Sequence, residues 1–378
     1  MPGPPRDGRA ATRRWLAAGA LLLAAAAGLL ALVERKPRTP AAAIEFPRTM
    51  RGPEWERMKA RRTLVVAHAP GEPPPEPGEP PARRDPFLAA LPARPGDAVV
   101  VFEANALRHS RLGEAFVACM LRRDPRTFDE IREETGIDVL KDVDRVAFAG
   151  EAVVVSGFFD RARWDRLERE GDLAVSRYGD AGRIWVPRPG AAATEEGVPP
   201  DPVMGVWKDQ LLVLGPDEES VRLALDQVEG RAEPAVALPD EMAYGEVYGV
   251  VPGEALRRLV GGAHGTLADR IAAAASRIEI HVDAMEAVAV VLNVRGEDPA
   301  RVEELSRALG GALAGARLEA QVSQDRQLAD LLDQARVALE GEGAFSLEMA
   351  VPADRLEGWF DRCEPPAGEE GPPDGPPD

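Results

Sequence analysis

The side chains most suggestive of chemistry lie in one predicted strand of the second half of the chain. Residues 278–283 read Ile-Glu-Ile-His-Val-Asp, so the two-residue period of a strand places Glu279, His281 and Asp283 on one face. Two carboxylates flanking an imidazole could bind a divalent metal ion. The alternative, which we favour, is a solvated polar face opposite a buried aliphatic one, and we assign no metal site here.

Three aspartates and one serine could also be mistaken for functional groups. Asp138, Asp142 and Asp144 are interrupted by aliphatic residues and lack the Asp-x-Asp-x-Asp-Gly order of a calcium loop, which favours a solvated turn. Ser156 stands at a predicted strand end without a base that the sequence identifies, so we expect a structural role. The remaining histidines are scattered without metal-ligand spacing and comprise His68, His109 and His264.

The cysteines and a glycine cluster complete the candidates. Cys119 shares the apolar face of a predicted helix, which favours a buried structural thiol, although one bridge to Cys363 is possible outside the cytoplasm. Gly310, Gly311 and Gly315 lie within a helical pattern and suggest close helix packing rather than phosphate binding. The signatures of serine hydrolases, phosphate loops and zinc proteases are absent from the sequence. We therefore assign no catalytic, cofactor-binding or metal-binding residue.

The net charge of −18 is unevenly distributed over the 378 residues. Residues 1–62 contain 13 Lys/Arg and 5 Asp/Glu, which leaves 33 basic and 59 acidic residues in the remainder. An acidic body repels phosphate backbones, so we expect no nucleic-acid binding and consider a basic protein of the cell envelope a possible partner. The basic N-terminal part is suited to a position beside anionic lipid headgroups.

One segment is apolar enough to enter a membrane. Residues 15–33 read WLAAGALLLAAAAGLLALV, which meets the bilayer requirement of about 20 apolar residues. We expect a transmembrane signal-anchor after a short basic head, residues 1–14, with a cleaved signal peptide as the alternative. Basic residues flank both ends nearly equally, and we favour a cytoplasmic N-terminus with the body periplasmic or extracellular.

The periodicity of the body predicts an α+β fold. Predicted strands comprise residues 98–102, 146–149, 152–156, 173–175, 183–186, 204–207, 211–214, 244–251, 278–282, 287–294 and 344–351. Each half reads as a strand, one or two helices, a hairpin and another helix, which indicates an internal repeat. Hairpins that lead into helices favour two similar lobes of largely antiparallel sheet with helices on one face.

These patterns divide the chain. We expect a juxtamembrane segment and Pro-rich spacer over residues 34–96, a first lobe over 97–230, a second over 240–363 and a disordered acidic tail over 364–378. The spacer includes the stretch from Pro70 to Pro86, which has the composition of a stiff polyproline-type linker. Residues 45–66 could form a short helix and strand or a simple spacer. In the first lobe, Asp160 is expected to cap a helix.

Two stretches resemble a known group of proteins. Residues 95–105, Pro-Gly-Asp-Ala-Val-Val-Val-Phe-Glu-Ala-Asn, and residues 136–146, Gly-Ile-Asp-Val-Leu-Lys-Asp-Val-Asp-Arg-Val, are similar to segments of an uncharacterised family of membrane-anchored bacterial proteins. The resemblance implies a repeated α+β body and anchoring, and it brings no activity, ligand or catalytic residue.

Three classes of function remain. We expect a non-enzymatic binding or scaffolding module of the cell envelope, held at the membrane through residues 15–33. The first alternative is an extracytoplasmic hydrolase with an unmarked carboxylate site, because acidic residues are numerous enough to hide a catalytic pair. The second is a carrier of an apolar ligand between the lobes.

Overall fold

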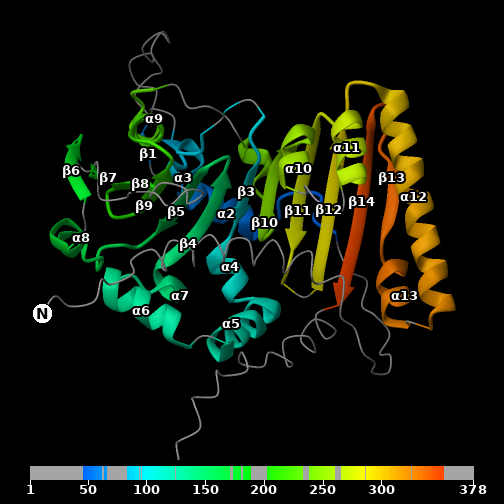
Figure 1. Ribbon diagram of the computed structural model, residues 1–378, viewed down its shortest axis with the longest axis horizontal. Coiled ribbons are helices and arrows are strands. Elements are labelled where there is room, and N and C mark those ends of the chain that lie inside the picture. The colour runs from blue at the N-terminus through cyan, green and yellow to red at the C-terminus, as the bar shows by residue number, and fades with distance from the viewer. Residues whose placement is uncertain are drawn as a thin grey trace, which may run out of the picture.

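A single large antiparallel sheet forms the centre of the molecule (Figure 1). The computed structural model describes residues 46–61, 64–65, 83–92, 94, 96–123, 125–170, 173–179, 182–188, 202–232, 238–259, 265–285, 287–324 and 326–352. Twelve strands follow the order β13-β14-β12-β11-β10-β3-β4-β5-β9-β8-β7-β6. The α+β class and the largely antiparallel pairing that the sequence predicts are therefore confirmed.

The strands agree closely with the hydrophobic patterns of the sequence. In chain order they are β3 (Val99–Phe102), β4 (Val143–Ala149), β5 (Ala152–Gly157), β6 (Leu173–Tyr178), β7 (Gly182–Pro187), β8 (Val203–Trp207), β9 (Leu211–Gly215), β10 (Val247–Pro252), β11 (Arg277–Asp283), β12 (Ala287–Arg295), β13 (Arg336–Leu339) and β14 (Ala344–Pro352). The short edge strand β13 is the one that the sequence did not predict.

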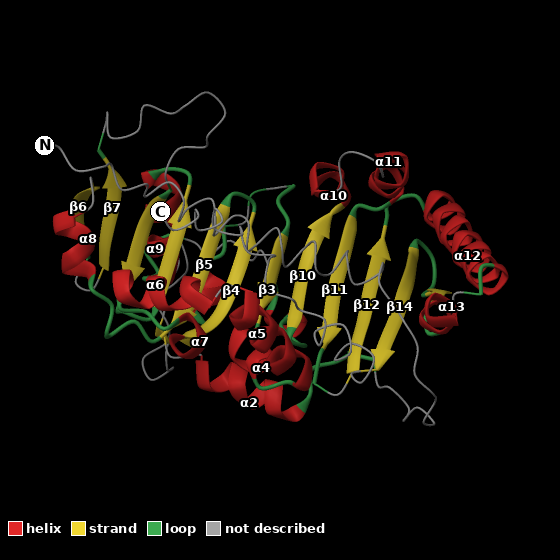
Figure 2. Cartoon of the chain, turned by 60° about the horizontal axis from the view of Figure 1, so that its bottom comes forward, coloured by secondary structure: helices red, strands yellow, loops and turns green. Residues whose placement is uncertain are grey.

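Helices connect the strands and lie around the sheet (Figure 2). In chain order they are α2 (Gly52–Arg61), α3 (Pro86–Ala89), α4 (Ala104–Arg108), α5 (Arg111–Arg123), α6 (Pro125–Thr135), α7 (Val139–Asp142), α8 (Trp164–Glu170), α9 (Glu218–Val228), α10 (Gly253–Leu259), α11 (Gly265–Ala274), α12 (Pro299–Val322) and α13 (Arg326–Asp333). Asp160 does not cap α8, because the amide of Arg163 donates to Thr135 instead and the helix begins at Trp164.

The first and second parts of the chain meet where β3 pairs with β10. Tyr248 lies opposite Val101, and the sheet continues without interruption from β4 to β11. A Cβ atom at Gly249 would lie 2.2 Å from the carbonyl oxygen of Val99, so only glycine fits this close approach. Outward from the joint the order is β3-β4-β5-β9 on one side and β10-β11-β12-β14 on the other.

Helices cover both faces of the sheet, which corrects the prediction that they cover one. On the face that carries Val101, hereafter the Val101 face, the buried residues pack with Leu225 of α9. On the opposite face, α8 contributes Trp164 to one cluster and α12 contributes Leu305 to another. Gly205 explains the position of α9, because a Cβ there would lie 2.5 Å from the side chain of Val221.

The segment before residue 97 is also folded onto the sheet. Asp85 caps α3 by accepting from the amide of Phe87, and residues 87–91 are buried in the core. The body therefore begins earlier than the boundary expected at residue 97. Sequence reasoning assigned these residues to the spacer because prolines precede the short apolar run Phe-Leu-Ala-Ala-Leu.

A small two-stranded ribbon changes the role expected of the Pro-rich stretch. Strand β1 (Leu64–Val65) pairs with β2 (Arg83–Arg84), and Val65 lies opposite Arg83. The two residues that flank the stretch 66–82 are thus paired with each other. Whatever its length, this Pro-rich stretch cannot act as a spacer between the body and the segments that precede β1.

Other expectations fall on residues that are not described. The anchor at residues 15–33 and the acidic tail at residues 364–378 both lie outside the described ranges. None of the helices within those ranges is both long enough and apolar enough to cross a bilayer.

Candidate functional site

The predicted row of Glu279, His281 and Asp283 does lie on one face of β11, but it is not solvated at its centre. His281 is 1% exposed, and its ring stacks on Tyr244 with centroids 3.8 Å apart and planes within 3°. Its Nδ1 lies 3.2 Å from the carbonyl oxygen of Tyr244. Burial lowers the pKa of His281 and so favours the neutral imidazole. The prediction of a solvated face is therefore wrong for this residue.

The two acidic neighbours of His281 are engaged by arginines. Glu279 lies 3.2 Å from Arg277, and Asp283 lies 2.7 Å from Arg51. Within the described ranges, no group of three or more His, Cys, Asp and Glu side chains is arranged to hold a metal ion. The row is thus part of a network of ion pairs and stacked rings.

The other candidate polar residues also have local partners. Ser156 is buried and lies 3.3 Å from Nε of Arg145, which fits the structural role expected of it. Asp138 caps α7, and Asp142 accepts from the amide of Asp138 at 2.7 Å. His109 lies 2.7 Å from the carbonyl oxygen of Asn105, whereas His68 and His264 lie outside the described residues.

Of two sequence expectations about packing, one is correct only in part and the other is wrong. Cys119 is buried as expected but is disulfide-bonded, which is the alternative to the favoured free thiol, and the sequence contains one other cysteine, Cys363, beyond the described residues. The glycines of α12 do not mark close helix packing, because a Cβ at Gly310, Gly311 or Gly315 would meet nothing within 4 Å. The first result reflects a partner distant in sequence, and the second reflects the position of α12 at the end of the sheet (Figure 1).

The main cluster of charged side chains lies where residues 46–61 cross the sheet, and we call this segment the strap. Its helix α2 turns Glu54, Met58 and Arg61 toward the body, as the three- and four-residue spacing of one helix face requires. Glu54 and Met58 are buried, whereas Trp55 on another face is 45% exposed. A polar helix with one apolar residue facing inward is therefore held largely by charge.

The first half of the strap neutralises carboxylates of the second half of the body. Arg48 forms an ion pair with Glu348, a residue of β14 with no exposed surface that also pairs with Arg336. Arg51 lies 3.0 Å from Glu246, which is 1% exposed and precedes β10. The amide of Ala284 donates to the other oxygen of Glu246 at 2.9 Å.

The end of the strap reaches the first half of the body. Arg61 donates to Glu103 at 3.0 Å and to Asp144 at 3.0 Å. Glu103, which follows β3, also accepts from the buried hydroxyl of Tyr248 on β10 at 2.9 Å. The strap therefore bridges both sides of the β3·β10 joint.

A fully buried ion pair lies beside the strap. Arg145 of β4 holds Asp85 through two hydrogen bonds of 2.5 and 2.9 Å, and both side chains are 5% exposed or less. The guanidinium also lies 4.2 Å from the centre of the Phe87 ring. Such a bidentate, stacked arrangement is the geometry that arginine rather than lysine provides.

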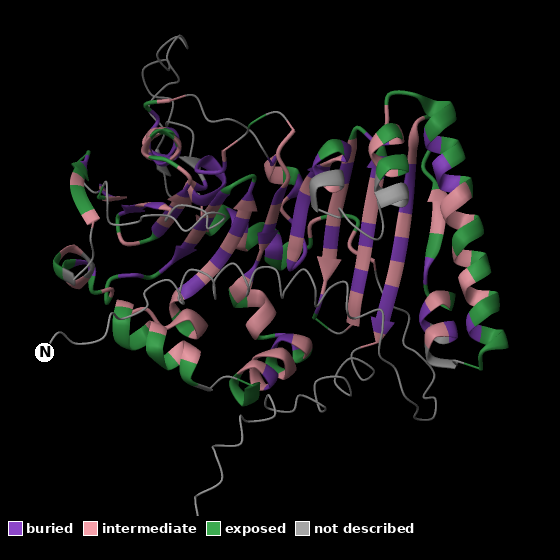
Figure 3. Cartoon of the chain, viewed as in Figure 1, coloured by how far each residue is buried: buried purple, intermediate pink, exposed green. Residues whose placement is uncertain are grey.

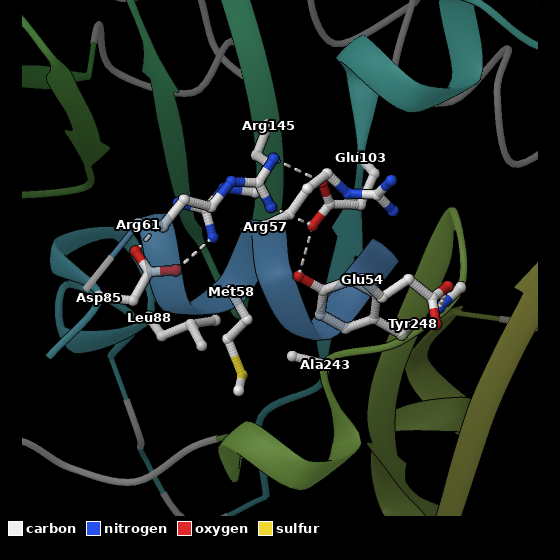
Figure 4. A pocket seen from close by; sticks show the side chains of 11 residues that line it. Glu54, Arg57, Met58, Arg61, Asp85, Leu88, Glu103, Arg145, Ala243 and Tyr248 are labelled. Atoms are coloured by element: carbon white, nitrogen blue, oxygen red, sulfur yellow. Dashed lines mark hydrogen bonds and ion pairs between the residues drawn. The ribbon is translucent and has the colours of Figure 1, made fainter. Parts of the chain in front are cut away.

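These groups surround a small pocket under α2 (Figure 4). Burial raises the pKa of Glu246 against the opposing effect of its donors. Burial acts in the same direction on Glu54, but the hydrogen bonds from Arg51 outweigh it and lower the pKa of Glu54. Because each carboxylate that lines or borders the pocket already accepts from an arginine or a backbone amide, the arrangement can fix the strap but offers no unengaged acid–base pair.

Sequence reasoning missed the residues of this network, although one signal was present. Strand β14 reads Ala-Phe-Ser-Leu-Glu-Met-Ala-Val-Pro, with Ser346 and Glu348 on the same face of an otherwise apolar strand. A carboxylate at the centre of such a strand requires a cationic partner. The sequence could not show that the partner, Arg48, lies 300 positions away.

Comparisons with known proteins leave the chain without a family assignment. No protein-family model and no curated protein matches it. Two crystal forms of the protein TP0453 have similar structures, with TM-scores of 0.41 and 0.39 at 10% sequence identity. The matches cover 74% and 72% of this chain and 98% and 96% of those chains. A likeness at this level carries no argument about fold or function.

Proposed function

We propose that the chain is a non-enzymatic binding or scaffolding module of the cell envelope, anchored through residues 15–33 with its body outside the cytoplasm. The body is built from two related halves that meet at β3 and β10. The matching strand order on the two sides of this joint, β3-β4-β5-β9 and β10-β11-β12-β14, supports the duplication.

The observation that carries the proposal is the strap. The strap follows the expected anchor by twelve residues, 34–45, and is bound across the joint by arginines at positions 48, 51 and 61. The strap is bound by the buried carboxylates that would otherwise be candidates for acid–base chemistry. A body held so firmly beside its own anchor is suited to presenting a surface at the membrane.

The disulfide supports the proposed position of the body outside the cytoplasm. Cys119 is 5% exposed and disulfide-bonded, and disulfides persist in oxidising compartments rather than in the cytosol. The acidic charge of the body supports a basic protein as the partner, because an excess of Asp and Glu favours association with basic proteins and disfavours binding of polyanions.

A thiol-trapping experiment tests the compartment. Whole cells that express the full chain are quenched in acid and alkylated before and after reduction. We expect Cys119 to react only after reduction, and a phosphatase fused after Asp378 to be active. Alkylation without prior reduction, together with an inactive phosphatase, would place the body in the cytoplasm and contradict the proposal.

A second experiment tests the absence of catalysis. The purified full chain should show no turnover on ester, peptide, phosphate and glycoside substrates. Turnover that is lost in Glu103→Gln, a residue that lines the pocket, but retained in Glu56→Gln, an exposed residue of α2, would instead identify the pocket as an active site.

A further inference from the structure

The first described residues show where the chain leaves the body toward the expected anchor. The ring of Phe46 lies 5.7 Å from the guanidinium of Arg336 at the start of β13. Arg48 pairs with Glu348 of β14 and lies 3.4 Å from Glu340, directly after β13. The strap therefore begins at the edge of the sheet formed by β13 and β14.

The length of the connection limits how far this edge can be from a bilayer. Only residues 34–45 separate the expected anchor from Phe46. Fully extended, they span at most about 40 Å. The ribbon of β1 and β2 adds nothing to this reach, because it follows the strap.

Exposed apolar side chains are concentrated at the same edge. Val322 and Leu318 of α12 are 77% and 63% exposed, and Leu339 of β13 is 56% exposed. Among the large apolar residues in the described part of the chain, only Phe158 is comparably exposed. Figure 3 shows α12 at the end of the sheet with its outer side exposed along most of its length.

Hydrogen bonds connect the apolar turn of α12 to the point where the strap begins. Arg317 donates to the carbonyl oxygens of Leu332, at 2.8 Å, and of Ala335. Ala335 precedes Arg336, which faces Phe46. Leu318 and the start of the strap are thus placed on adjoining parts of one edge. The outer side of α12 is also open at Gly311 and Gly315, where added Cβ atoms would meet nothing.

The charge of α12 is compatible with a lipid surface. The helix contains three arginines and three glutamates and is neutral overall, whereas the body as a whole is strongly acidic. Arg307 lies 3.5 Å from Glu303 within the helix. Anionic headgroups would therefore repel this helix less than the remainder of the body.

We propose that the α12–β13 edge rests on the bilayer surface, with Leu318 and Val322 inserted at the lipid–water boundary. This inference rests on the anchor of the proposed function. The anchor makes the contact intramolecular, so two or three apolar side chains suffice to populate it although they would not hold a free protein at a membrane. The contact fixes which side of the sheet faces the lipid and leaves the β6 end free for a partner.

Photo-crosslinking of the full chain in phosphatidylcholine vesicles tests the contact. Benzoylphenylalanine is placed at position 318 or 322, with position 223 as the matched control. Leu223 is also a helical, exposed leucine, at 46%, but it lies on α9 in the other half of the sheet. We expect at least about tenfold more lipid adduct at 318 and 322 than at 223, because the anchor raises the local concentration of lipid there.

The outcomes separate this inference from the proposal on which it rests. Adducts with a second copy of the chain, or equally low lipid labelling at all three positions, would overturn the contact while leaving the anchor intact. A chain that does not remain in the vesicles after an alkaline wash would overturn the anchor itself. As a second measure, Leu318→Asn with Val322→Asn should remain anchored and should lose the protection of α12 from trypsin that vesicles give to the unaltered chain.

Discussion

The Val101 face of the sheet is held in two different ways on the two sides of the β3·β10 joint. On the side of β3, Val101, Val154 and Val213 are buried together with Leu225 of α9. On the side of β10, the same face presents Glu279, His281 and Glu348, which contact Arg277, the ring of Tyr244 and Arg48 of the strap, respectively. One continuous sheet therefore has an apolar half and a charged half on one face.

The difference has physical consequences. Apolar burial is non-directional, and dissolved ions do not screen it as they screen an exposed ion pair. An ion pair with a buried carboxylate requires a particular geometry and leaves a costly charge behind when its partner is removed. The apolar half should therefore provide most of the stability, whereas the charged half should determine where the strap lies.

Leu225→Ala should have the largest effect on the free energy of unfolding. Leu225 has no exposed surface, and truncation leaves a cavity that costs roughly 2–5 kcal/mol. Leu223→Ala on the same helix should cost less than about 0.5 kcal/mol, because Leu223 is 46% exposed. Denaturant unfolding followed by tryptophan fluorescence measures both. Equal effects of the two substitutions would contradict the position of α9.

Arg51→Met should have an intermediate effect. It removes the cationic partner of Glu246, which would cost about 3–5 kcal/mol in a closed interior. The Arg51 side chain is 42% exposed, however, so water can reach the site and we expect about 1–3 kcal/mol. Lys59→Met, which breaks an exposed pair with Glu56, is the control and should change stability by less than about 0.5 kcal/mol.

A double variant sharpens this prediction. Glu246→Gln removes the buried charge that Arg51→Met would leave unpaired, so the two substitutions together should cost less than their sum. Strictly additive free energies of unfolding in such a cycle would show that the two side chains do not interact.

The stability of the charged half should depend on pH through His281. Its folded pKa is below the ordinary value, so the unfolded chain binds a proton first and stability falls as pH decreases through about 6.5. Burial raises the pKa of the Glu246 carboxyl, so the folded chain binds this proton more tightly than the unfolded chain does. This contribution to stability decreases as the pH rises above the ordinary pKa of the carboxyl, which is the opposite sense to that of His281. His281→Phe keeps a ring against Tyr244, and its unfolding free energy should fall less between pH 7.5 and 5.5. Parallel pH profiles of the two proteins would argue against a buried neutral His281.

Salt should produce the smallest effect. Arg48 and Arg51 are 45% and 42% exposed, so high ionic strength should weaken their pairs by about 0.5 kcal/mol or less. Arg145 and Asp85 are both buried and should not respond. The free energy of unfolding is measured for Arg51→Met and for the unaltered chain, each in low and in high salt. The difference in this free energy between the two proteins should be smaller in high salt.

The sequence predicted the strands well because their alternation is a local property. The stretch 278–283 alternates aliphatic and polar residues and forms β11, and residues 287–294 form most of β12. It predicted the placement of helices less well. Whether α9 covers one face or the other depends on the space left at Gly205, which involves Val221 sixteen positions later.

The candidate site was predicted only in part, for a related reason. The row on β11 was identified from alternation, but its burial under Tyr244 was not, because the predicted strand 244–251 included Tyr244 whereas β10 begins at Val247 and Tyr244 lies in the loop before it. The strap was left open between a helix and a spacer, because its inward face carries Glu54, Met58 and Arg61 rather than an apolar stripe. A helix that binds through charge has no hydrophobic signature to detect.

The pairing of Val65 with Arg83 makes the length of the Pro-rich stretch irrelevant to the position of the body. The free energy needed to bring the two ends of a chain segment together rises only slowly with its length, by about 0.6 kcal/mol for each doubling. Residues 66–82 are therefore a permissive site for insertion, where an epitope or a fluorescent domain could be introduced without displacing α2 or α3. The same tolerance means that natural chains of this fold could differ widely in this stretch and still place the strap identically.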